Sequence, residues 1–342
     1  MRPVLVALMV AACSKDEPRS SGAPPDPAPS PRDPSSPRVP PDPSPRAPLD
    51  PSSPRVPPDP PRAATTDAAA AAVAPAVADA PAGSPQPPAT DPHLPPHRSF
   101  ADLATALAAT LPADARVIGF GELHARADVP GVRSSLSAFT DALPAFGERI
   151  SDLVVETWRV DGACGSGAVA ATQRLETSVR RPASTKSEIG KLVDATRAAK
   201  IQPHAMTVSC ADYDKIAPAK GDVDPIAMLT LTTKELTRIA RSAVAVRDKQ
   251  PGHRPWIALY GGALHNDRFP PKGVEEWSYA DAVDKATGGK YVEVDIVAPE
   301  LAEADKLSRG EPWFPLCASA KQVLVWQRGE RSFVVVLPRT PP

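Results

Sequence analysis

The sequence has few aromatic residues, almost no net charge and none of the common catalytic or nucleotide-binding signatures. Only 5% of its 342 residues are Phe, Trp or Tyr, which disfavours a large aromatic cleft for haem. The formal net charge at pH 7 is −1 and no cluster of Lys and Arg stands out, so we predict no nucleic-acid partner. A P-loop, an H-E-x-x-H motif and a G-x-S-x-G motif are all absent. The chemistry must therefore come from other residues.

Cysteine is also scarce, with four residues in the whole chain. No C-x-x-C pair is present, which disfavours a cysteine-ligated metal and excludes covalently attached haem. Cys164 and Cys210 each follow a predicted strand and fall on the same edge of the predicted sheet. We predict that these two form a disulfide in an oxidising compartment, and that Cys317 keeps a free thiol.

The first residues are typical of an export signal. After a single Arg, the apolar run from Val4 to Ala12 is too short to cross a bilayer. It leads into Cys13 through Val-Ala-Ala, which resembles the lipobox of bacterial lipoproteins. We expect residues 1–12 to be a signal peptide and Cys13 to carry a lipid that anchors the protein to a membrane. The alternative is an apolar start with a stray cysteine. Ser14 favours the outer membrane, facing the periplasm or the cell surface, by resemblance to lipoprotein sorting rules.

Residues 13–97 are rich in proline. More than half of the 45 prolines lie between Pro18 and Pro96, and no aromatic residue lies among them. The segment 33–43 recurs without change at 50–60. A repeat this dense in proline cannot form a helix or a ladder-bonded strand, and it buries too little apolar surface to offset the entropy of ordering its backbone. We predict a disordered tether between the anchor and the domain that follows.

About 240 residues remain, from 98 to 340, which is enough for one α/β core. Apolar runs alternate with helix-like segments, which predicts a mostly parallel sheet flanked by helices, with a C-terminal antiparallel hairpin. The predicted strands are 117–120, 152–156, 204–208, 256–260 and 291–297, and the hairpin is 322–326 with 333–337. The predicted helices are 100–111 with Ser99 as its cap, 132–146, 169–180, 187–200, 225–249 and 275–287.

Two Gly-x-x-His motifs directly follow apolar runs. Gly121-Glu122-Leu123-His124 comes after the run 116–120, and Gly262-Ala263-Leu264-His265 comes after 256–260. Such runs are typical of buried parallel strands, and glycine lets the backbone turn sharply where a strand ends. Ligands bind outside the carboxyl ends of the strands in open α/β sheets. We therefore expect the two histidines to share one site.

A third apolar run, 152–156, ends in a carboxylate. Because a carboxylate there is costly to bury without a partner, we expect Glu156 to face the two histidines. These three elements, in this order, resemble the superfamily of erythromycin esterases, haem-binding lipoproteins of the ChaN type and Tiki metalloproteases. The resemblance covers roughly residues 98–340. It implies either a hydrolase or a haem-binding domain.

The motif residues allow two kinds of hydrolytic site. His124, His265 and Glu156 could ligate a divalent Zn, Mn or Co ion that activates water. Without a metal, one histidine acts as general base and a carboxylate holds it in place. Both readings fit the resemblance, and both imply cleavage of an ester or amide in a small-molecule or peptide substrate. Glu122 is predicted either to take part in catalysis or to bond the amides of its own loop.

Haem or iron binding is the alternative function. By the same resemblance, ChaN-type members hold haem through exposed Tyr and His side chains. Tyr213, in a predicted exit loop at 211–214, is the candidate ligand. A non-catalytic domain with a vestigial site is the third alternative. His204 and His253 are predicted to be structural.

Overall fold

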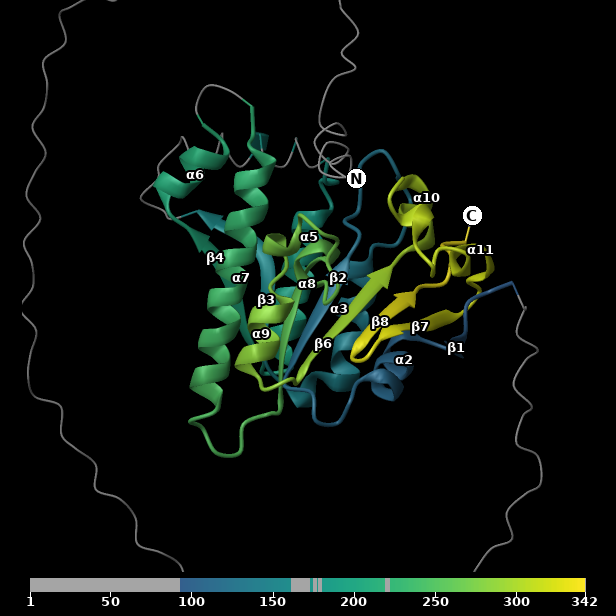
Figure 1. Cartoon of the computed structure of the whole chain (residues 1–342), viewed down its shortest axis with the longest axis horizontal. Helices are drawn as coiled ribbons and strands as arrows, with labels where there is room; N and C mark the ends of the chain where they lie inside the picture. The colour runs from purple at the N-terminus through teal and green to yellow at the C-terminus, as the bar shows by residue number, and fades with distance from the viewer. Residues whose placement is uncertain (1–92, 161–172, 175–176, 178–179, 219–221, 342) are drawn as a thin grey trace, which may run out of the picture. The chain divides into compact units, whose positions relative to one another are not determined.

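The computed structural model describes residues 93–160, 173–174, 177, 180–218 and 222–341 (Figure 1). The predicted signal peptide, Cys13, Cys164 and nearly all of the predicted tether lie outside these residues, as does most of the helix predicted at 169–180. Among the described helices, none is both long and apolar enough to cross a membrane.

The described strands form one eight-stranded sheet in the order β1-β7-β8-β6-β2-β5-β3-β4 (Figure 1). The strands from β8 to β4 in this order are parallel, whereas β7 runs antiparallel to both β8 and β1. The predicted mostly parallel sheet with a C-terminal antiparallel hairpin is therefore confirmed. The strands are β1 (His97–Phe100), β2 (Val117–Glu122), β3 (Ile150–Val160), β4 (Gln202–Val208), β5 (Trp256–Gly262), β6 (Tyr291–Val297), β7 (Val323–Gly329) and β8 (Ser332–Val336).

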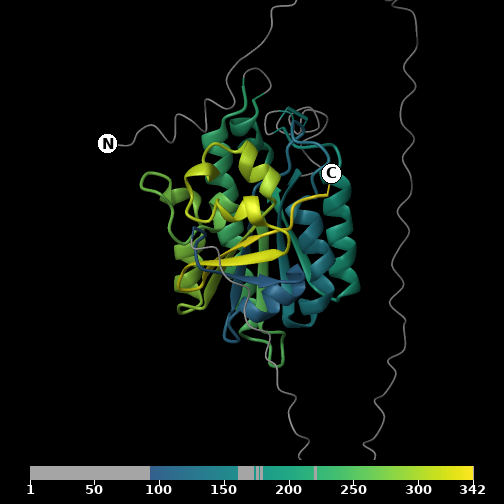
Figure 2. The same ribbon diagram turned by 90° about the vertical axis from the view of Figure 1, so that its right-hand side faces the viewer.

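Helices cover both faces of the sheet, and Figure 2 shows the sheet between them. Ile118 and Phe120 of β2 point into a core formed with α2, α3 and α5, while Val117 points into a second core with α7 and α9. Burial on both faces explains why the central strands are nearly continuous apolar runs. These helices are α2 (Leu103–Thr110), α3 (Ser135–Phe146), α5 (Thr185–Ala198), α7 (Pro225–Arg247) and α9 (Ala280–Ala286).

Several short helices connect these layers. They are α6 (Cys210–Ile216), α8 (Ala263–Asn266), α10 (Pro299–Ala304) and α11 (Leu316–Ser319), with 3-10 helices at Gly147–Arg149, Glu275–Trp277 and Ser308–Gly310. The single helix predicted at 275–287 is therefore divided into a 3-10 turn and α9. The predicted exit loop 211–214 is also wrong, because Ser209 caps α6 by accepting the Asp212 N–H at 3.2 Å.

The start of the domain differs from the prediction. Ser99 does not cap a helix, because it lies in β1 and pairs with Leu324 of β7. Helix α2 instead begins at Leu103, and the carboxylate of Asp102 accepts the Thr105 N–H at 2.8 Å. Serine and aspartate are both good helix caps, so the local sequence does not show which of Ser99 and Asp102 begins the helix. Pairing of residues 97–100 with the exposed edge of β7 excludes Ser99, because it places Ser99 in the sheet.

Two strands continue past their predicted ends. Strand β2 includes Gly121 and Glu122, which pair with Gly261 and Gly262 of β5. Strand β3 runs on to Val160, but its pairing with β4 shifts between Val155 and Trp158. Glu156 therefore lies at an irregularity within β3 and not at its end. Such bulges redirect a side chain away from the regular pleat.

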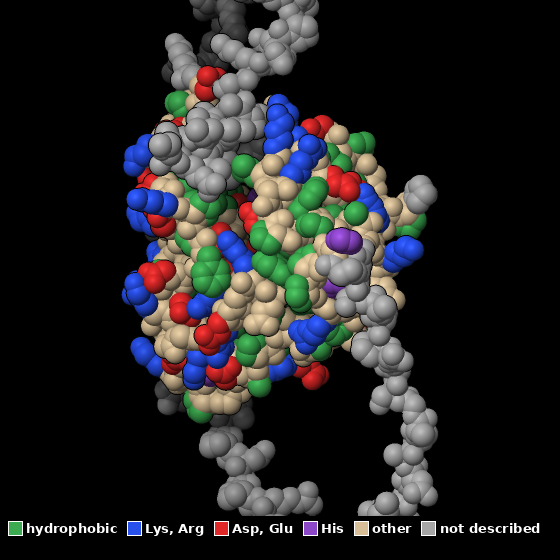
Figure 3. Space-filling view, turned by 45° about the vertical axis from the view of Figure 1, so that its right-hand side comes forward, with side chains coloured by type: hydrophobic (Ala, Val, Ile, Leu, Met, Phe, Trp, Pro, Cys, Tyr) green, Lys and Arg blue, Asp and Glu red, His purple; other side chains and the backbone are tan. Residues whose placement is uncertain are grey.

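On the face drawn in Figure 3, acidic and basic side chains are interspersed, with hydrophobic side chains scattered between them. Among the described residues, the large hydrophobic side chains that are exposed are Ile226, Val246 and Phe269. Single exposed hydrophobic residues are normal on a soluble surface and need no partner to explain them.

A buried ion pair joins α7 to the amino-terminal part of β3. Asp152 of β3 accepts hydrogen bonds from Arg247 Nε at 2.6 Å and from Arg247 Nη2 at 3.0 Å. Its Oδ1 also lies 2.8 Å from His204 Nε2 of β4. Burial alone raises the pKa of Asp152, but these hydrogen bonds outweigh it and hold the pKa far below the usual value. His204 thus has the structural role predicted for it.

We expect Asp152→Ala to lower the free energy of unfolding by about 3 kcal/mol, because it leaves the Arg247 charge partly buried without its acceptor. Asp141→Ala is the matched control, since Asp141 also pairs with an arginine, Arg133, but both of these side chains are exposed, at 65% and 56%. Its loss should cost less than about 1 kcal/mol. Urea unfolding of the three proteins measures both values. Equal losses in the two variants would contradict a buried, stabilising pair.

Candidate functional site

A cleft of about 1510 Å³ lies at the carboxyl ends of the parallel strands. Its base is made by the ends of β2, β5 and β6 and by the bulge of β3. His124, His265, Glu122 and Glu156 all line it, so the structure brings together the motif residues that the sequence analysis singled out. Parallel pairing of β2 with β5 and of β5 with β3 is the reason, because it places the ends of all three strands at one edge.

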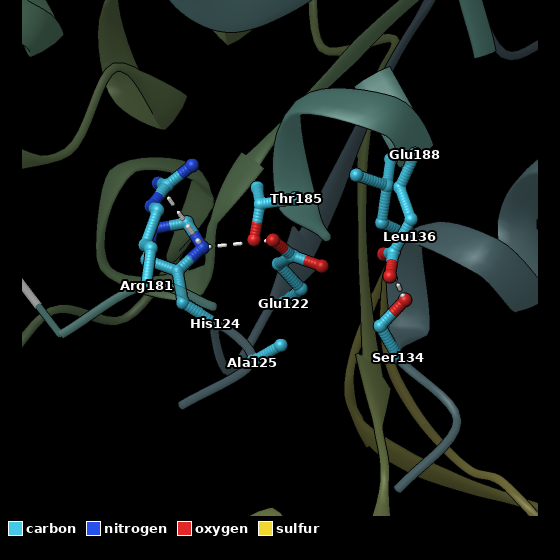
Figure 4. A pocket seen from close by; sticks show the side chains of 8 residues that line it. All are labelled: Glu122, His124, Ala125, Ser134, Leu136, Arg181, Thr185 and Glu188. Carbon is cyan, nitrogen blue, oxygen red and sulfur yellow. Dashed lines mark hydrogen bonds and ion pairs between the residues drawn. The ribbon is translucent and has the colours of Figure 1, made fainter. Parts of the chain in front are cut away.

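His124 is held by a chain of hydrogen bonds, of which Figure 4 shows the part between Glu122 and His124. The Tyr260 hydroxyl donates to Glu122 Oε2 at 2.6 Å, and Glu122 Oε1 lies 2.8 Å from His124 Nδ1. Burial, with the adjacent Glu122 charge, raises the pKa of Tyr260 well above its usual value, so the hydroxyl keeps its proton. The carboxylate can only accept, so Nδ1 carries the hydrogen and Nε2 keeps a lone pair. Glu122 thus bonds a side chain, and not the amides of its own loop.

His265 is oriented in a similar way by a backbone carbonyl. Its Nδ1 lies 3.0 Å from the Trp277 oxygen and 2.8 Å from Thr233 Oγ1 of α7. A carbonyl only accepts, so Nδ1 carries the hydrogen and Nε2 is the free nitrogen. The residue is 4% exposed. Burial lowers the pKa of His265, and the negative charge of Glu156 only partly offsets this, so the ring is neutral near pH 7.

Glu156 is the buried anion of the site. Its Oε2 accepts the Gly262 N–H at 2.6 Å, and its Oε1 lies 3.9 Å from His124 Nε2. Burial raises the pKa of Glu156, but the fields of His265, His124 and Arg181, together with the Gly262 hydrogen bond, outweigh burial and lower it. The carboxylate therefore stays ionised.

Glycine is required beside this carboxylate for space, not for an unusual backbone angle. A Cβ at Gly261 would lie 2.5 Å from Glu156 Oε2 and 2.9 Å from Glu156 Cβ. One at Gly262 would lie 3.0 Å from His124 Nε2. The paired glycines at the end of β5 thus leave the room in which Glu156 and His124 approach each other.

Arg181 was missed by the sequence analysis. It lies just before α5, and its Nη2 is 2.9 Å from His124 Nε2 (Figure 4). The same nitrogen is 3.7 Å from Glu156 Oε1. Arginine is common on surfaces, and no motif surrounds this one. The fold alone reveals that it reaches the two functional side chains.

Asp295 of β6 was also missed, although it lines the same cleft. Its Oδ1 accepts a hydrogen bond from Asn266 Nδ2 at 3.0 Å. Burial and the neighbouring Glu293 raise the pKa of Asp295 well above its usual value, which favours its protonated form. A signal was present in the sequence, because Glu293 and Asp295 place two carboxylates inside the apolar strand 291–297.

Other predicted site residues lie elsewhere. Tyr213 belongs to α6, is 2% exposed and packs with Val208 and Trp158, so it is not the exposed ligand expected for haem. Cys210 is disulfide-bonded, and its predicted pairing with Cys164 stays a prediction because Cys164 lies outside the described residues. Cys317 is a buried free thiol, as expected.

The donors do not fit a divalent metal in this arrangement. In the part of the chain that the structure describes, no group of three or more His, Cys, Asp or Glu side chains is placed to hold an ion. A guanidinium also lies against His124 Nε2, the nitrogen that would bind the metal.

No family model and no curated protein matches the chain. Among solved structures, the type III effector HopBA1 matches at 16% identity with a TM-score of 0.32, over 66% of this chain and 88% of that chain. A crystal structure of a protein from Bacillus cereus matches at 9% identity with a TM-score of 0.33, over 71% of this chain and 95% of that chain. At these TM-scores the likeness carries no argument about the site.

We expect Gly261→Ala to lower the free energy of unfolding by about 1–3 kcal/mol, because the added methyl group forces Glu156 out of its place. Gly190→Ala is the control, since a Cβ at Gly190 in α5 meets nothing within 4 Å. In a helix this second change should stabilise the protein by up to about 1 kcal/mol. Chemical unfolding tests both, and a neutral Gly261→Ala would contradict the close approach.

The buried neutral ring of His265 predicts a pH-dependent stability. Its pKa is lower in the folded than in the unfolded protein, so the unfolded chain binds the proton first as the pH falls below about 6.5. The stabilisation is fully present above that pH and is lost below it. We expect the free energy of unfolding to fall less steeply between about pH 7 and 5 in His265→Gln than in wild type. His253→Gln should keep the wild-type slope, and a slope unchanged in His265→Gln would refute the buried neutral ring.

Proposed function

We propose that the protein is an extracytoplasmic hydrolase that cleaves an ester or amide without a metal, with His124 as general base. The observation that carries this is the Tyr260–Glu122–His124 chain of hydrogen bonds, which ends at an imidazole nitrogen on the base of a cleft. A carboxylate that holds one ring nitrogen fixes the tautomer and favours the imidazolium formed when the other nitrogen takes a proton.

The reaction follows from the protonation states of the side chains. His124 Nε2 takes a proton from a water molecule, whose oxygen forms a bond to the substrate carbonyl carbon. The Arg181 guanidinium, which now donates to that nitrogen, turns to the developing oxyanion and stabilises its charge. Asp295, whose raised pKa favours the protonated form, gives its proton to the leaving oxygen or nitrogen as the ester or amide bond breaks, and the imidazolium then returns its proton through solvent to the Asp295 carboxylate.

His265 and Glu156 complete the base of the cleft. The unprotonated Nε2 of His265 can accept a hydrogen bond from the substrate, and the Glu156 carboxylate keeps Arg181 in position between turnovers. The walls are largely apolar and include Trp158, Met228 and Trp313. The volume of about 1510 Å³ exceeds the roughly 300–1,000 Å³ of common small-molecule pockets, so we infer a bulky or extended substrate.

The resemblance to erythromycin esterases and Tiki proteases supports the same reaction class, since it rests on the motifs whose histidines and glutamates line the cleft. The sequence before the domain supports the location. A lipid on Cys13 and the proline-rich tether would hold the domain outside the cytoplasm, on the outer membrane or the cell surface.

Haem binding of the ChaN type has less support, because Tyr213 is buried and does not line the cleft. A titration of the full-length protein with hemin separates the two functions. A Soret band that depends on His124 or His265 would favour haem over hydrolysis.

We expect the full-length protein to hydrolyse at least one member of a panel of p-nitrophenyl esters and peptide anilides of increasing size. His124→Ala should lower kcat/KM by about 10²–10⁴-fold, because the general base is lost. Glu122→Gln should lower kcat by at least about tenfold, because an amide can present its NH₂ to Nδ1 and favour the wrong tautomer. His253→Gln serves as the control and should leave kcat/KM unchanged. Hydrolysis that survives in His124→Ala, or none by wild type, would contradict the proposal.

A further inference from the structure

The guanidinium of Arg181 lies where the resemblance would place a metal. Its Nη2 is 2.9 Å from His124 Nε2 and 3.7 Å from Glu156 Oε1, two of the three atoms expected as ligands. Its positive charge also acts on the third, because it contributes to lowering the pKa of His265. Arg181 thus contacts two of the three side chains that a shared ion would bind, and its charge acts on the third.

The spacing of these donors suits a guanidinium better than an ion. His124 Nε2 and Glu156 Oε1 are 3.9 Å apart. Two ligands at about 2.1 Å from a tetrahedral ion would be separated by only about 3.4 Å. A guanidinium spans wider gaps, because it presents several N–H donors in a fixed plane. Direct ligation would therefore need both side chains to move.

The backbone holds Arg181 in this place. The carbonyl of Arg180 accepts the Ala127 N–H at 2.9 Å, which ties the segment before α5 to the chain just beyond His124. Arg180 has a φ of 52°, a left-handed conformation that is uncommon for a non-glycine residue. Pro182 restricts the residue before it to extended conformations. Together these features direct Arg181 at the base of the cleft.

The electrostatics require a cation there. The Glu156 side chain is only 9% exposed, and a carboxylate that is this buried needs a cationic partner. Its Oε1 lies 3.9 Å from His124 Nε2 and 3.7 Å from Arg181 Nη2, and a histidine is a cation only when it is protonated. A guanidinium stays charged at every physiological pH. Arg181 is therefore the permanent counter-ion of the Glu156 carboxylate.

From this geometry we infer that Arg181 is a resident cation that takes the place of a divalent metal between His124 and Glu156, and that it keeps such metals out. The inference rests on the proposed function only in treating these two residues as the working groups. On this inference, motif residues that suggest metal binding serve in this protein without a metal. It also predicts that a metal site can be created by removing one side chain.

The test is a titration of full-length protein with ZnSO₄ and CoCl₂, by calorimetry and by elemental analysis after equilibrium dialysis. Arg181→Met removes the charge and keeps much of the volume. We expect this variant to bind one Zn²⁺ per chain at least about tenfold more tightly than wild type, which corresponds to about 1.4 kcal/mol. Adding Glu156→Gln to Arg181→Met should abolish the gain. Lys272→Met is the matched control, since it removes one positive charge from the same cleft without touching either ligand.

Equal metal affinity in wild type and Arg181→Met, whether tight or absent, would overturn the inference. An equal gain in Lys272→Met would also overturn it, because the effect would then reflect net charge alone. Should Arg181→Met fail to fold, ¹⁵N NMR of the arginine side chains in otherwise intact protein replaces it. His124→Ala and Glu156→Gln should each shift the Arg181 guanidinium signal, and no shift in either variant would refute the contact.

The metal titration and the hydrolysis assay test different claims, so either can fail without the other. The titration measures equilibrium binding, so its failure leaves His124 free to act as a base. Conversely, absence of hydrolysis by the wild-type protein would refute the proposed function without affecting the outcome of the metal titration.

Discussion

The site depends on keeping one carboxylate ionised in a place that water scarcely reaches. Glu156 is anchored by the Gly262 N–H and balanced by the Arg181 guanidinium. An unpaired buried charge would cost several kcal/mol or would be neutralised by a proton. Three features of the fold serve this one requirement. They are the glycines at the end of β5, the bulge in β3 and the segment before α5 that holds Arg181. Each brings a partner to the carboxylate or leaves space for it.

The same cleft holds carboxyl groups whose pKa values are shifted in opposite directions. Positive charge and an N–H donor lower the pKa of Glu156, whereas burial and the neighbouring Glu293 raise the pKa of Asp295. Such groups are suited to different roles in one reaction, here an anion that holds Arg181 and an acid that serves the leaving group. The two histidines also differ in what holds them. A carboxylate orients His124, while a backbone carbonyl orients His265, whose pKa is lowered by burial.

A guanidinium and a metal ion solve the same electrostatic problem differently. An ion polarises a carbonyl strongly, but it needs three or more donors converging within about 2.3 Å. A guanidinium needs only hydrogen-bond acceptors at about 3 Å, and its charge is independent of pH and of metal supply. The described donors around Glu156 are spaced for the second solution. Motifs that suggest metal ligands are therefore compatible with an organic cation, because histidine and glutamate are also good hydrogen-bond acceptors.

The sequence by itself determined the layered α/β fold and the edge of the sheet at which the motifs meet. Alternation of apolar runs with helical segments is a local pattern, and parallel strands place their carboxyl ends together whatever their order. It could not determine that residues 97–100, which include the predicted cap and first residue of the first helix, would pair with the edge of β7, or that β3 would bulge at Glu156. Both depend on partners distant in sequence. Arg181 and Asp295 became visible only in the tertiary structure, because a common surface residue and an acid in a strand gain their meaning from the atoms that surround them. The spacing of residues along the chain predicts which of them come together. Their distances and the burial of their charges determine what they do at the site.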